Sequence, residues 1–261
     1  NAAGQIGDTD LGNGHVLLNR NAIDTLTSSV TAHSSRGIYI QEYDSLVFND
    51  LGTMTPQYSL DGNNSFAHDP LLQGLNSTLG PLKVVTLAGS MTVASAISAG
   101  GTGDILLEAR GATSDLLINA SVTGGSGDIS LVAGRSIDVN SAVSTGTTGT
   151  LYLQAGQSIS IDSTLTTQAG DILVTAGQDL SQSETVSSSS GDIAIQAGGN
   201  ISQTASGHVT ASGGDVLVKA ANNWSMAGAT TITAGGGDVL GQATAGSIQL
   251  GVIQVTSPTA N

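Results

Sequence analysis

Apolar residues alternate with polar or small residues in short segments along most of the chain, and these segments recur at a nearly constant interval. The recurring unit starts with Gly-Asp, continues with apolar residues at alternate positions and ends with Ala, as in GDILLEA at 103–109 and GDIAIQAG from Gly191. Seven such units start between Gly103 and Gly237, 21 to 24 residues apart. An apolar step of two predicts β-strands, and a fixed period of this size predicts a solenoid.

Each unit contains two further apolar segments, which predict a second and a third strand. The second follows the Ala-Gly turn, as in SIDVN at 136–140, and the third is shorter, as in TIT at 231–233. Hairpins do not repeat this evenly, whereas a coil of three strands per turn does, each strand pairing in parallel with its copy one turn later. Earlier copies start at Gly14 and Gly37, and a degenerate one starts at Leu82.

We therefore predict an all-β fold: a parallel β-helix with three short strands per 21–24 residue turn, about ten turns and a dry interior. Crossovers between parallel strands are almost always right-handed, so we expect a right-handed coil. The whole chain, residues 1–261, is then a single β-helix domain. Residues 1–13 and 250–261 lack the pattern, and we expect them to be irregular.

The repeat is interrupted between about residues 50 and 81, where three of the four prolines lie. Proline removes a donor from a strand ladder, so we expect a loop or small excursion that projects from one turn. Insertions in repeat proteins lie on one face and often carry binding. The candidate binding residues of this insertion are Tyr58, Asp61, Phe66, His68 and Asp69.

Large apolar residues also occupy positions of the first strand that alternate with its inward pair, so we expect them to face outward. They form a candidate interaction face, which consists of Leu106, Tyr152, Leu173, Leu217 and Leu240. An exposed apolar patch of this size needs an explanation. We favour cover by the insertion, or packing against a neighbouring molecule, over ligand binding.

Composition narrows the classes of function. The chain has 20 acidic and 6 basic residues and a formal net charge of -14, which argues against nucleic acid as a partner. It contains no cysteine, which excludes disulfides and cysteine-based metal sites. No run of 18 apolar residues occurs, so we expect no membrane-spanning helix.

The aspartate after the glycine recurs in most units and predicts a column of stacked carboxylates. One interpretation is a row of Ca²⁺ sites, and the other is that each carboxylate accepts a hydrogen bond from a nearby backbone N–H at a turn. We favour the second, because Ca²⁺ needs several oxygens per ion and each turn offers one carboxylate. Asp61, His68 and Asp69 also lie near one another, but ordinary turn residues explain them better, so we expect neither a metal nor another cofactor.

The third strands carry Ser/Thr pairs, such as Thr164 with Thr166 and Thr231 with Thr233. Flat threonine arrays of this kind bind ice in some β-solenoids. Because Ala96, Ala142 and His208 interrupt the series, we favour an ordinary solvated strand face.

The unit GDI-x-L-x-AG, followed by further apolar strands, resembles the repeats of filamentous-haemagglutinin-type bacterial exoproteins. The resemblance is clear from Gly103 to Ala243 and loose from Gly14 to Asn49. It implies a secreted or cell-surface adhesin that is built as a β-helix. The Asn-Pro-Asn motifs of that family's secretion domain do not occur here, so the chain resembles a stretch of the shaft.

We therefore expect a non-catalytic segment that acts as a rigid adhesin shaft, structural filament or interaction scaffold. Its expected partners are other copies of the protein, by end-to-end or lateral association, or glycans or proteins of a host or cell surface. The alternative is a β-helix polysaccharide lyase or glycoside hydrolase, with a site in the region of Tyr39 to Asp69. The sequence has only 3% aromatics and no Ser-His-Asp or GxSxG signature, which weakens the enzyme interpretation.

Overall fold

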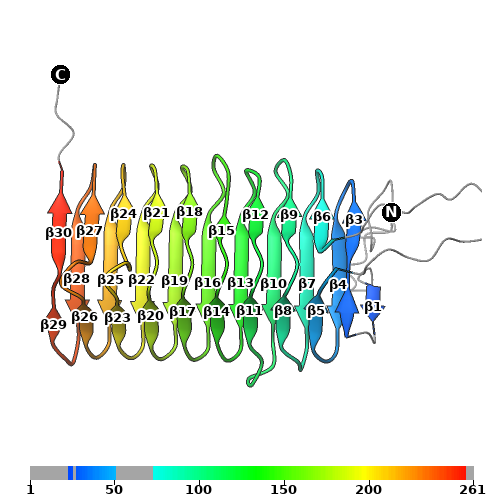
Figure 1. The fold of residues 1–261 in the computed structure, drawn as a ribbon, viewed down its shortest axis with the longest axis horizontal. Helices are drawn as coiled ribbons and strands as arrows, with labels where there is room; N and C mark the ends of the chain where they lie inside the picture. The colour runs from blue at the N-terminus through cyan, green and yellow to red at the C-terminus, as the bar shows by residue number, and fades with distance from the viewer. Residues whose placement is uncertain (1–22, 26–27, 51–72, 257–261) are drawn as a thin grey trace, which may run out of the picture.

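The chain folds into a three-sided coil of parallel β-strands in this computed structural model, which describes residues 23–25, 28–50 and 73–256. The described residues form 30 short strands and no helix, and the strands build three sheets of ten strands each. Figure 1 shows the coils side by side along the long axis of the molecule. None of the described segments is a helix that could cross a membrane.

Successive strands alternate among the three sheets, so each sheet takes every third strand. Sheet 1 consists of β1 (Ile23–Thr25), β4 (Ile38–Glu42), β7 (Leu82–Thr86), β10 (Ile105–Ala109), β13 (Ile129–Ala133), β16 (Leu151–Ala155), β19 (Ile172–Ala176), β22 (Ile193–Ala197), β25 (Val216–Ala220) and β28 (Val239–Ala243). Sheet 2 consists of β2 (Ser29–Val30), β5 (Leu46–Phe48), β8 (Met91–Val93), β11 (Leu116–Ile118), β14 (Ile137–Val139), β17 (Ile159–Ile161), β20 (Leu180–Gln182), β23 (Ile201–Gln203), β26 (Trp224–Met226) and β29 (Ile248–Gln249). Sheet 3 consists of β3 (Ala32–Ser34), β6 (Leu75–Ser77), β9 (Ile97–Ala99), β12 (Val122–Gly124), β15 (Val143–Ser144), β18 (Leu165–Thr167), β21 (Val186–Ser188), β24 (Val209–Ala211), β27 (Thr231–Ala234) and β30 (Val252–Val255).

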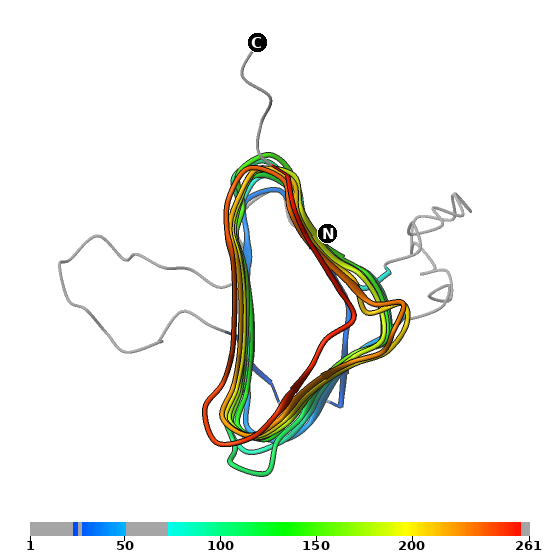
Figure 2. The same cartoon turned by 90° about the vertical axis from the view of Figure 1, so that its left-hand side faces the viewer.

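The predicted parallel β-helix is confirmed, including its hand. Seen from the end of the coil that carries β28–β30, the chain runs anticlockwise around a triangle while it advances toward the viewer (Figure 2). That combination is a right-handed coil, the hand that strand twist favours for parallel crossovers. Ten strands in each sheet agree with the expected number of about ten turns.

The interior is apolar because every strand turns its alternate residues inward. In sheet 1, Ile105 pairs with Ile129 and Ala109 pairs with Ala133, so identical or similar side chains stack from coil to coil. These four residues are at most 3% exposed. The stacked alanines lie at the ends of the seven sheet 1 strands from β10 to β28, where the chain turns toward sheet 2. Stability therefore arises from contacts between neighbouring coils, as in other solenoids.

A row of three hydrogen-bonded side chains lies inside the core. Gln203 donates from Nε2 to Gln182 Oε1 at 2.8 Å and accepts at Oε1 from the indole N–H of Trp224, also at 2.8 Å. Gln182 in turn donates to the backbone oxygens of Glu184 and His208. The three residues of this row, Gln182, Gln203 and Trp224, are at most 3% exposed. The polar groups are satisfied across three successive coils, so their burial does not leave unpaired donors or acceptors.

Two boundaries differ from the prediction. Leu75–Ser77 form β6 within sheet 3, so the coil resumes before residue 81, where we expected the insertion to end. Residues 252–255 form β30, so part of the segment expected to be irregular, residues 250–261, belongs to sheet 3. In both cases a three- or four-residue strand between polar neighbours carries too little alternation to be recognised from sequence. Residues 51–72, which hold most of the predicted insertion, lie outside the described residues.

Candidate functional site

The aspartate column, which Thr150 interrupts, runs along the corner between sheet 3 and sheet 1 and joins neighbouring coils. The N–H of Asp128 donates to Asp104 Oδ1 at 2.9 Å, and the N–H of Asp215 donates to Asp192 Oδ1 at 2.8 Å. The same bond joins Thr150 to Asp128, Asp192 to Asp171 and Asp238 to Asp215. The carboxylates thus accept backbone N–H groups, as we favoured from sequence, but each N–H belongs to the following coil and not to a local turn.

These bonds use the carboxylates as structural acceptors. At a corner the backbone turns away from the regular ladder, and a side-chain oxygen then satisfies an N–H that would otherwise lack a protein partner. Within the described ranges, no three His, Asp or Glu side chains come together as a group that could hold a metal ion. The column is therefore a ladder of coil-to-coil hydrogen bonds.

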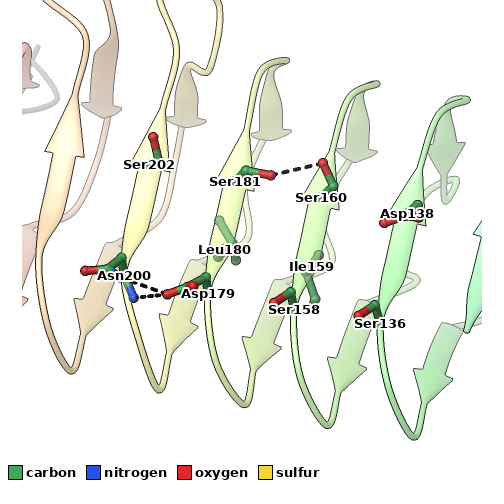
Figure 3. A pocket seen from close by; sticks show the side chains of 10 residues that line it. All are labelled: Ser136, Asp138, Ser158, Ile159, Ser160, Asp179, Leu180, Ser181, Asn200 and Ser202. Carbon is green, nitrogen blue, oxygen red and sulfur yellow. Dashed lines mark hydrogen bonds between the residues drawn. The ribbon is translucent and has the colours of Figure 1, made fainter. Parts of the chain in front are cut away.

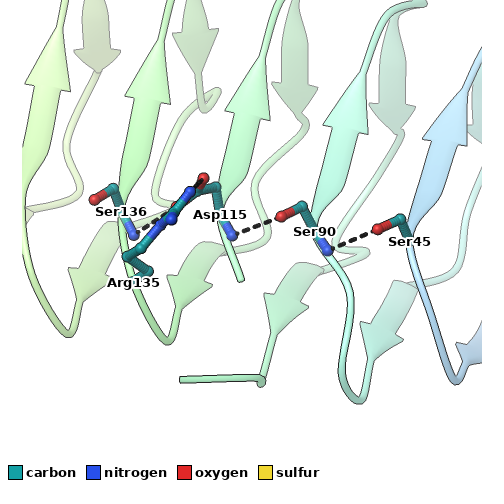
Figure 4. A network of polar contacts seen from close by, with 5 residues as sticks. All are labelled: Ser45, Ser90, Asp115, Arg135 and Ser136. Carbon is teal, nitrogen blue, oxygen red and sulfur yellow. Dashed lines mark hydrogen bonds and ion pairs between the residues drawn. The ribbon is translucent and has the colours of Figure 1, made fainter. Parts of the chain in front are cut away.

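A second ladder of the same kind follows the corner between sheet 1 and sheet 2 (Figure 4). Ser90 N–H donates to Ser45 Oγ at 3.1 Å, and Asp115 N–H donates to Ser90 Oγ at 3.0 Å. Further along the same corner, Asn200 N–H donates to Asp179 Oδ1 at 2.7 Å. Sequence analysis missed this ladder because serine, asparagine and aspartate share it without a common motif.

The second ladder also contains an ion pair. Arg135 contacts Asp115 with two guanidinium nitrogens, and the Nε–Oδ1 distance is 2.6 Å. The hydrogen bond from Arg135 is the main cause that lowers the pKa of Asp115, and the positive charge of Arg135 and the N–H of Ser136 act in the same direction. The Arg135 side chain is 45% exposed, so the pair fixes the local geometry of the corner and contributes little stability.

A shallow polar groove of about 420 Å³ lies on the outer face of sheet 2, over β14, β17, β20 and β23 (Figure 3). Its floor is a row of short side chains in register: Asp138 pairs with Ser160, which pairs with Ser181, which pairs with Ser202. The hydroxyls of Ser160 and Ser181 lie 3.0 Å apart, and Figure 3 shows them pointing toward each other. The groove thus offers hydroxyl and carboxylate groups in a regular array.

Electrostatics in the groove differ from those at the corner. Partial burial is the main cause that raises the pKa of Asp138, and the nearby carboxylates of Asp115 and Asp162 raise it further. None of the ten residues that line the groove is aromatic or basic. The groove therefore lacks both the aromatic surface on which sugar rings stack and the cations that bind acidic sugars. It can present hydrogen-bonding groups to a polar ligand.

The predicted interaction face lies on the outer side of sheet 1. In register order, Leu106 is followed by Ser130, Tyr152, Leu173, Ala194, Leu217 and Leu240. The structure therefore brings the five predicted residues into one column, although Ser130 and Ala194 interrupt it. Leu173 is 38% exposed and Leu240 is 61% exposed, whereas the others are half-buried. The column continues to Lys83 and Tyr39, where burial raises the pKa of the tyrosine hydroxyl.

The five candidate binding residues of the insertion, Tyr58, Asp61, Phe66, His68 and Asp69, lie outside the described residues. On the outer face of sheet 3, the second members of the predicted Ser/Thr pairs and the serine or threonine in register with them on the other strands form an unbroken column over seven coils: Ser98, Thr123, Ser144, Thr166, Ser187, Thr210 and Thr233. The three residues that interrupt the series in the sequence, Ala96, Ala142 and His208, each lie just before a sheet 3 strand and so do not break this column. His208 Nδ1 accepts the N–H of Thr231 at 3.0 Å.

Comparisons with protein-family models, with curated proteins and with solved structures find no match to this chain. Function is therefore inferred from the fold and its surfaces alone. A parallel β-helix supports both enzymes and non-enzymes, so the fold by itself does not decide between them.

Proposed function

We propose that the chain is a non-catalytic segment of a secreted or cell-surface bacterial exoprotein, where it acts as a rigid adhesin shaft, filament element or interaction scaffold. The observation that carries this proposal is the continuity of the coil. Three parallel backbone ladders run along the described part of the molecule, and side-chain hydrogen bonds at two corners join several of its neighbouring coils. A rod with hydrogen bonds along every side resists bending, which suits a spacer.

The outer faces support a role in contact with other molecules. Sheet 1 presents a partly exposed apolar column, and sheet 2 presents a polar groove. Each face repeats at the spacing of the coils, about 4.8 Å. Repeated weak contacts along such a face add up when a partner engages several of them. We propose that the partners are other copies of the protein, or glycans or proteins on a cell surface.

Two features of the described residues favour this role over sugar cleavage. The stacked carboxylates of the corner ladders already accept backbone N–H groups, so they are held in structural bonds. The groove on sheet 2 has no aromatic lining residue. Trp224 and Phe48, the two largest buried side chains, lie in the core and not on a face that a polysaccharide can reach.

Surface binding and polysaccharide cleavage can be measured on the same purified chain. We expect the immobilised chain to retain glycans or cell-surface proteins and to leave acidic polysaccharides intact. A Leu173→Ser/Leu217→Ser variant tests the apolar column, with Thr166→Ala on sheet 3 as the control. Turnover of a polysaccharide that is lost in both Asp61→Ala and Asp69→Ala would overturn the non-catalytic proposal and favour the hydrolase or lyase alternative.

A further inference from the structure

The outward apolar column of sheet 1 is symmetric about a point midway between β16 and β19. From β10 to β25 its side chains run large, small, large, large, small, large, in this order: Leu106, Ser130, Tyr152, Leu173, Ala194 and Leu217. The large members are exposed or half-buried. Because this order is the same in both directions, the column matches a reversed copy of itself.

Two opposite charges on the same face share this symmetry. Glu108 and Lys219 are the fourth residues of β10 and β25, which are the third strands on either side of the midpoint. Both side chains belong to the outward column beside the apolar one, and Lys219 is exposed. Glu108 also contacts Arg110 at 2.9 Å. A reversed copy therefore places a lysine opposite each Glu108.

We propose that the outer face of sheet 1 is a docking surface for the same face of a second copy of this chain, so that two rods lie side by side in an antiparallel, two-fold dimer. The two-fold axis runs parallel to the strands, between β16 and β19. It reverses the rod but keeps each strand position opposite itself, as an isologous interface requires. Leu106 then faces Leu217 of the second copy. Glu108 faces Lys219 of the second copy.

The central contacts of this arrangement are apolar. Tyr152 faces Leu173 of the second copy on both sides of the axis. The two interruptions of the column, Ser130 and Ala194, face each other, so no leucine between β10 and β25 faces a small residue. Stacked sheets pack about 10 Å apart, which leaves room for one layer of side chains from each copy.

The size and shape of the face suit a reversible dimer. Figure 2 shows most coils nearly superimposed along the axis, so the face is close to flat. The eight strands from β7 to β28 make a face about 38 Å long and about 16 Å wide. Two such faces cover about 1,200 Å², the lower end of the range for specific interfaces.

The aspartate columns of the two copies lie along one rim of the interface. Asp104 faces Asp215 of the second copy across the gap of about 10 Å between the sheets. This separation exceeds the Debye length of about 8 Å at 0.15 M salt, so the repulsion along the rim is largely screened.

Sedimentation velocity of the full chain across a range of concentrations tests the pairing. We expect a species of about twice the 25.8 kDa chain mass that gives way to monomer on dilution. Leu173→Lys places a charge beside the axis and should yield monomer at every concentration. Thr210→Lys, on the outer face of sheet 3, should leave the dimer intact. Circular dichroism verifies that both variants keep the coil.

A charge swap tests the register. Lys219→Glu places a carboxylate opposite Glu108 of the second copy and should weaken the dimer by about tenfold or more. Adding Glu108→Lys restores opposite charges and should recover most of this loss. If rods paired in the same direction, these two positions would face leucines, and the second substitution would restore nothing. A double variant that dimerises no better than Lys219→Glu overturns the antiparallel pairing.

Cross-linking locates the axis without a destabilising variant. The chain has no cysteine, so a single Thr175→Cys on β19 directs a short bismaleimide to the axis, where the two copies of this residue lie one coil apart. Gln242→Cys in the same column is the control, because its two copies lie seven coils apart, about 34 Å. We expect a cross-linked dimer from the first variant and none from the second. Cross-links from both, or from neither, overturn the proposal.

This inference rests on the proposed scaffold function, because it names a second copy as the partner and sheet 1 as the face. The two can fail separately. A chain that stays monomeric at all concentrations but is retained by glycans or cell-surface proteins overturns the pairing and leaves the scaffold function standing. A chain that dimerises as described but cleaves a polysaccharide overturns the non-catalytic function and leaves the pairing standing.

Discussion

Individual polar side chains act at two kinds of place in this protein, inside the core and at its corners. In the core, Gln203 joins Gln182 below it to Trp224 above it. At the corners, aspartate, serine and asparagine oxygens accept the N–H of the next coil. In both places a hydrogen bond crosses between coils, so one residue contributes to the stability of two or three coils.

Replacement of Gln203 by alanine should be among the most costly substitutions in the core. It removes the hydrogen-bond partner of the buried Trp224 indole N–H and of the buried Gln182 Oε1, and it opens a cavity. We expect the free energy of unfolding to fall by about 2–5 kcal/mol, measured by urea denaturation. The control is Gln196→Ala, on the outer side of sheet 1, which should change stability by no more than about 0.5 kcal/mol. Equal losses for the two variants would contradict the buried chain of hydrogen bonds.

The corner ladder gives a second prediction at this scale. Asp192→Asn keeps an oxygen that can accept the Asp215 N–H, whereas Asp192→Ala removes it. We expect the alanine variant to be less stable than the asparagine variant by about 1 kcal/mol. EDTA should leave the melting temperature of the unaltered chain unchanged, because the carboxylates bond to N–H groups. A drop of many degrees on chelation would favour the Ca²⁺ interpretation.

The groove predicts a pH dependence with a definite sign. Burial and neighbouring carboxylates raise the folded-state pKa of Asp138. The folded chain therefore binds a proton more readily than the unfolded chain, and the contribution of Asp138 to stability falls as the pH rises through the window between the two pKa values. Asp138→Asn should raise the melting temperature at pH 7 by a degree or two at most and have no such benefit below the unfolded pKa. Thermal melts from pH 3 to pH 7 measure this.

For Asp115, the same thermal melts should show a pH dependence of stability opposite in sign to that of Asp138. Its pKa is lowered by Arg135, so its contribution is present above the unfolded pKa and is lost as the pH falls through the folded pKa. Asp115→Asn should therefore lower the melting temperature slightly at pH 7, and the difference should vanish at low pH. If the Asp138→Asn and Asp115→Asn variants shift the melting temperature in the same direction at pH 7, the opposite pKa shifts assigned to the two carboxylates are wrong.

At the corners, close approach of neighbouring coils restricts which residues fit. The glycine before each aspartate lies against the carbonyl of the coil beneath it. A Cβ built on Gly170 would lie 2.0 Å from the Gly149 oxygen, and one built on Gly191 would lie 2.3 Å from the Gly170 oxygen. The Gly-Asp step of the repeat is thus explained by two contacts with neighbouring coils: glycine for close approach and aspartate for the N–H.

Alanine at Gly170 should therefore destabilise the rod. The new methyl group meets backbone, which cannot move without displacing the neighbouring coil, and we expect a loss of about 1–3 kcal/mol in the free energy of unfolding. Gly228 is the matched control because nothing lies within 4 Å of a Cβ built there. Gly228→Ala should be neutral or stabilising by up to about 1 kcal/mol. Denaturation of the two variants side by side decides the point.

Sequence reasoning predicted the elements well wherever alternation and the repeat coincide. Long sheet 1 strands such as Ile105–Ala109 can be recognised in the sequence because they carry three inward apolar residues. The short strand β6 carries a single inward leucine, which is too little for the sequence pattern to predict a strand. The corner ladders and the sheet 2 groove depend on register between coils, which no single segment encodes. The serines at 160, 181 and 202 resemble any solvated strand residue until the register places them in one row.

At the scale of the whole molecule, the surfaces and the ladders follow from one repeated displacement. A coil-to-coil spacing of about 4.8 Å makes ten coils a rod roughly 45 Å long. Residues that are far apart in the sequence lie close together, and the distance between them depends only on how many coils separate them. The aspartate column, the apolar column and the groove are all consequences of that spacing.

Pulsed electron paramagnetic resonance distances within the outward column of sheet 3 test this account most directly. The chain lacks cysteine, so spin labels can be attached in pairs at Ser98 with Thr166, with Thr210 and with Thr233. These pairs are three, five and six coils apart, and the stacking predicts backbone separations of about 14, 24 and 29 Å. A narrow distribution for each pair, growing in proportion to the number of coils, is the expected result. Broad distributions, or distances that do not follow the coil count, would contradict the stacked three-sided coil.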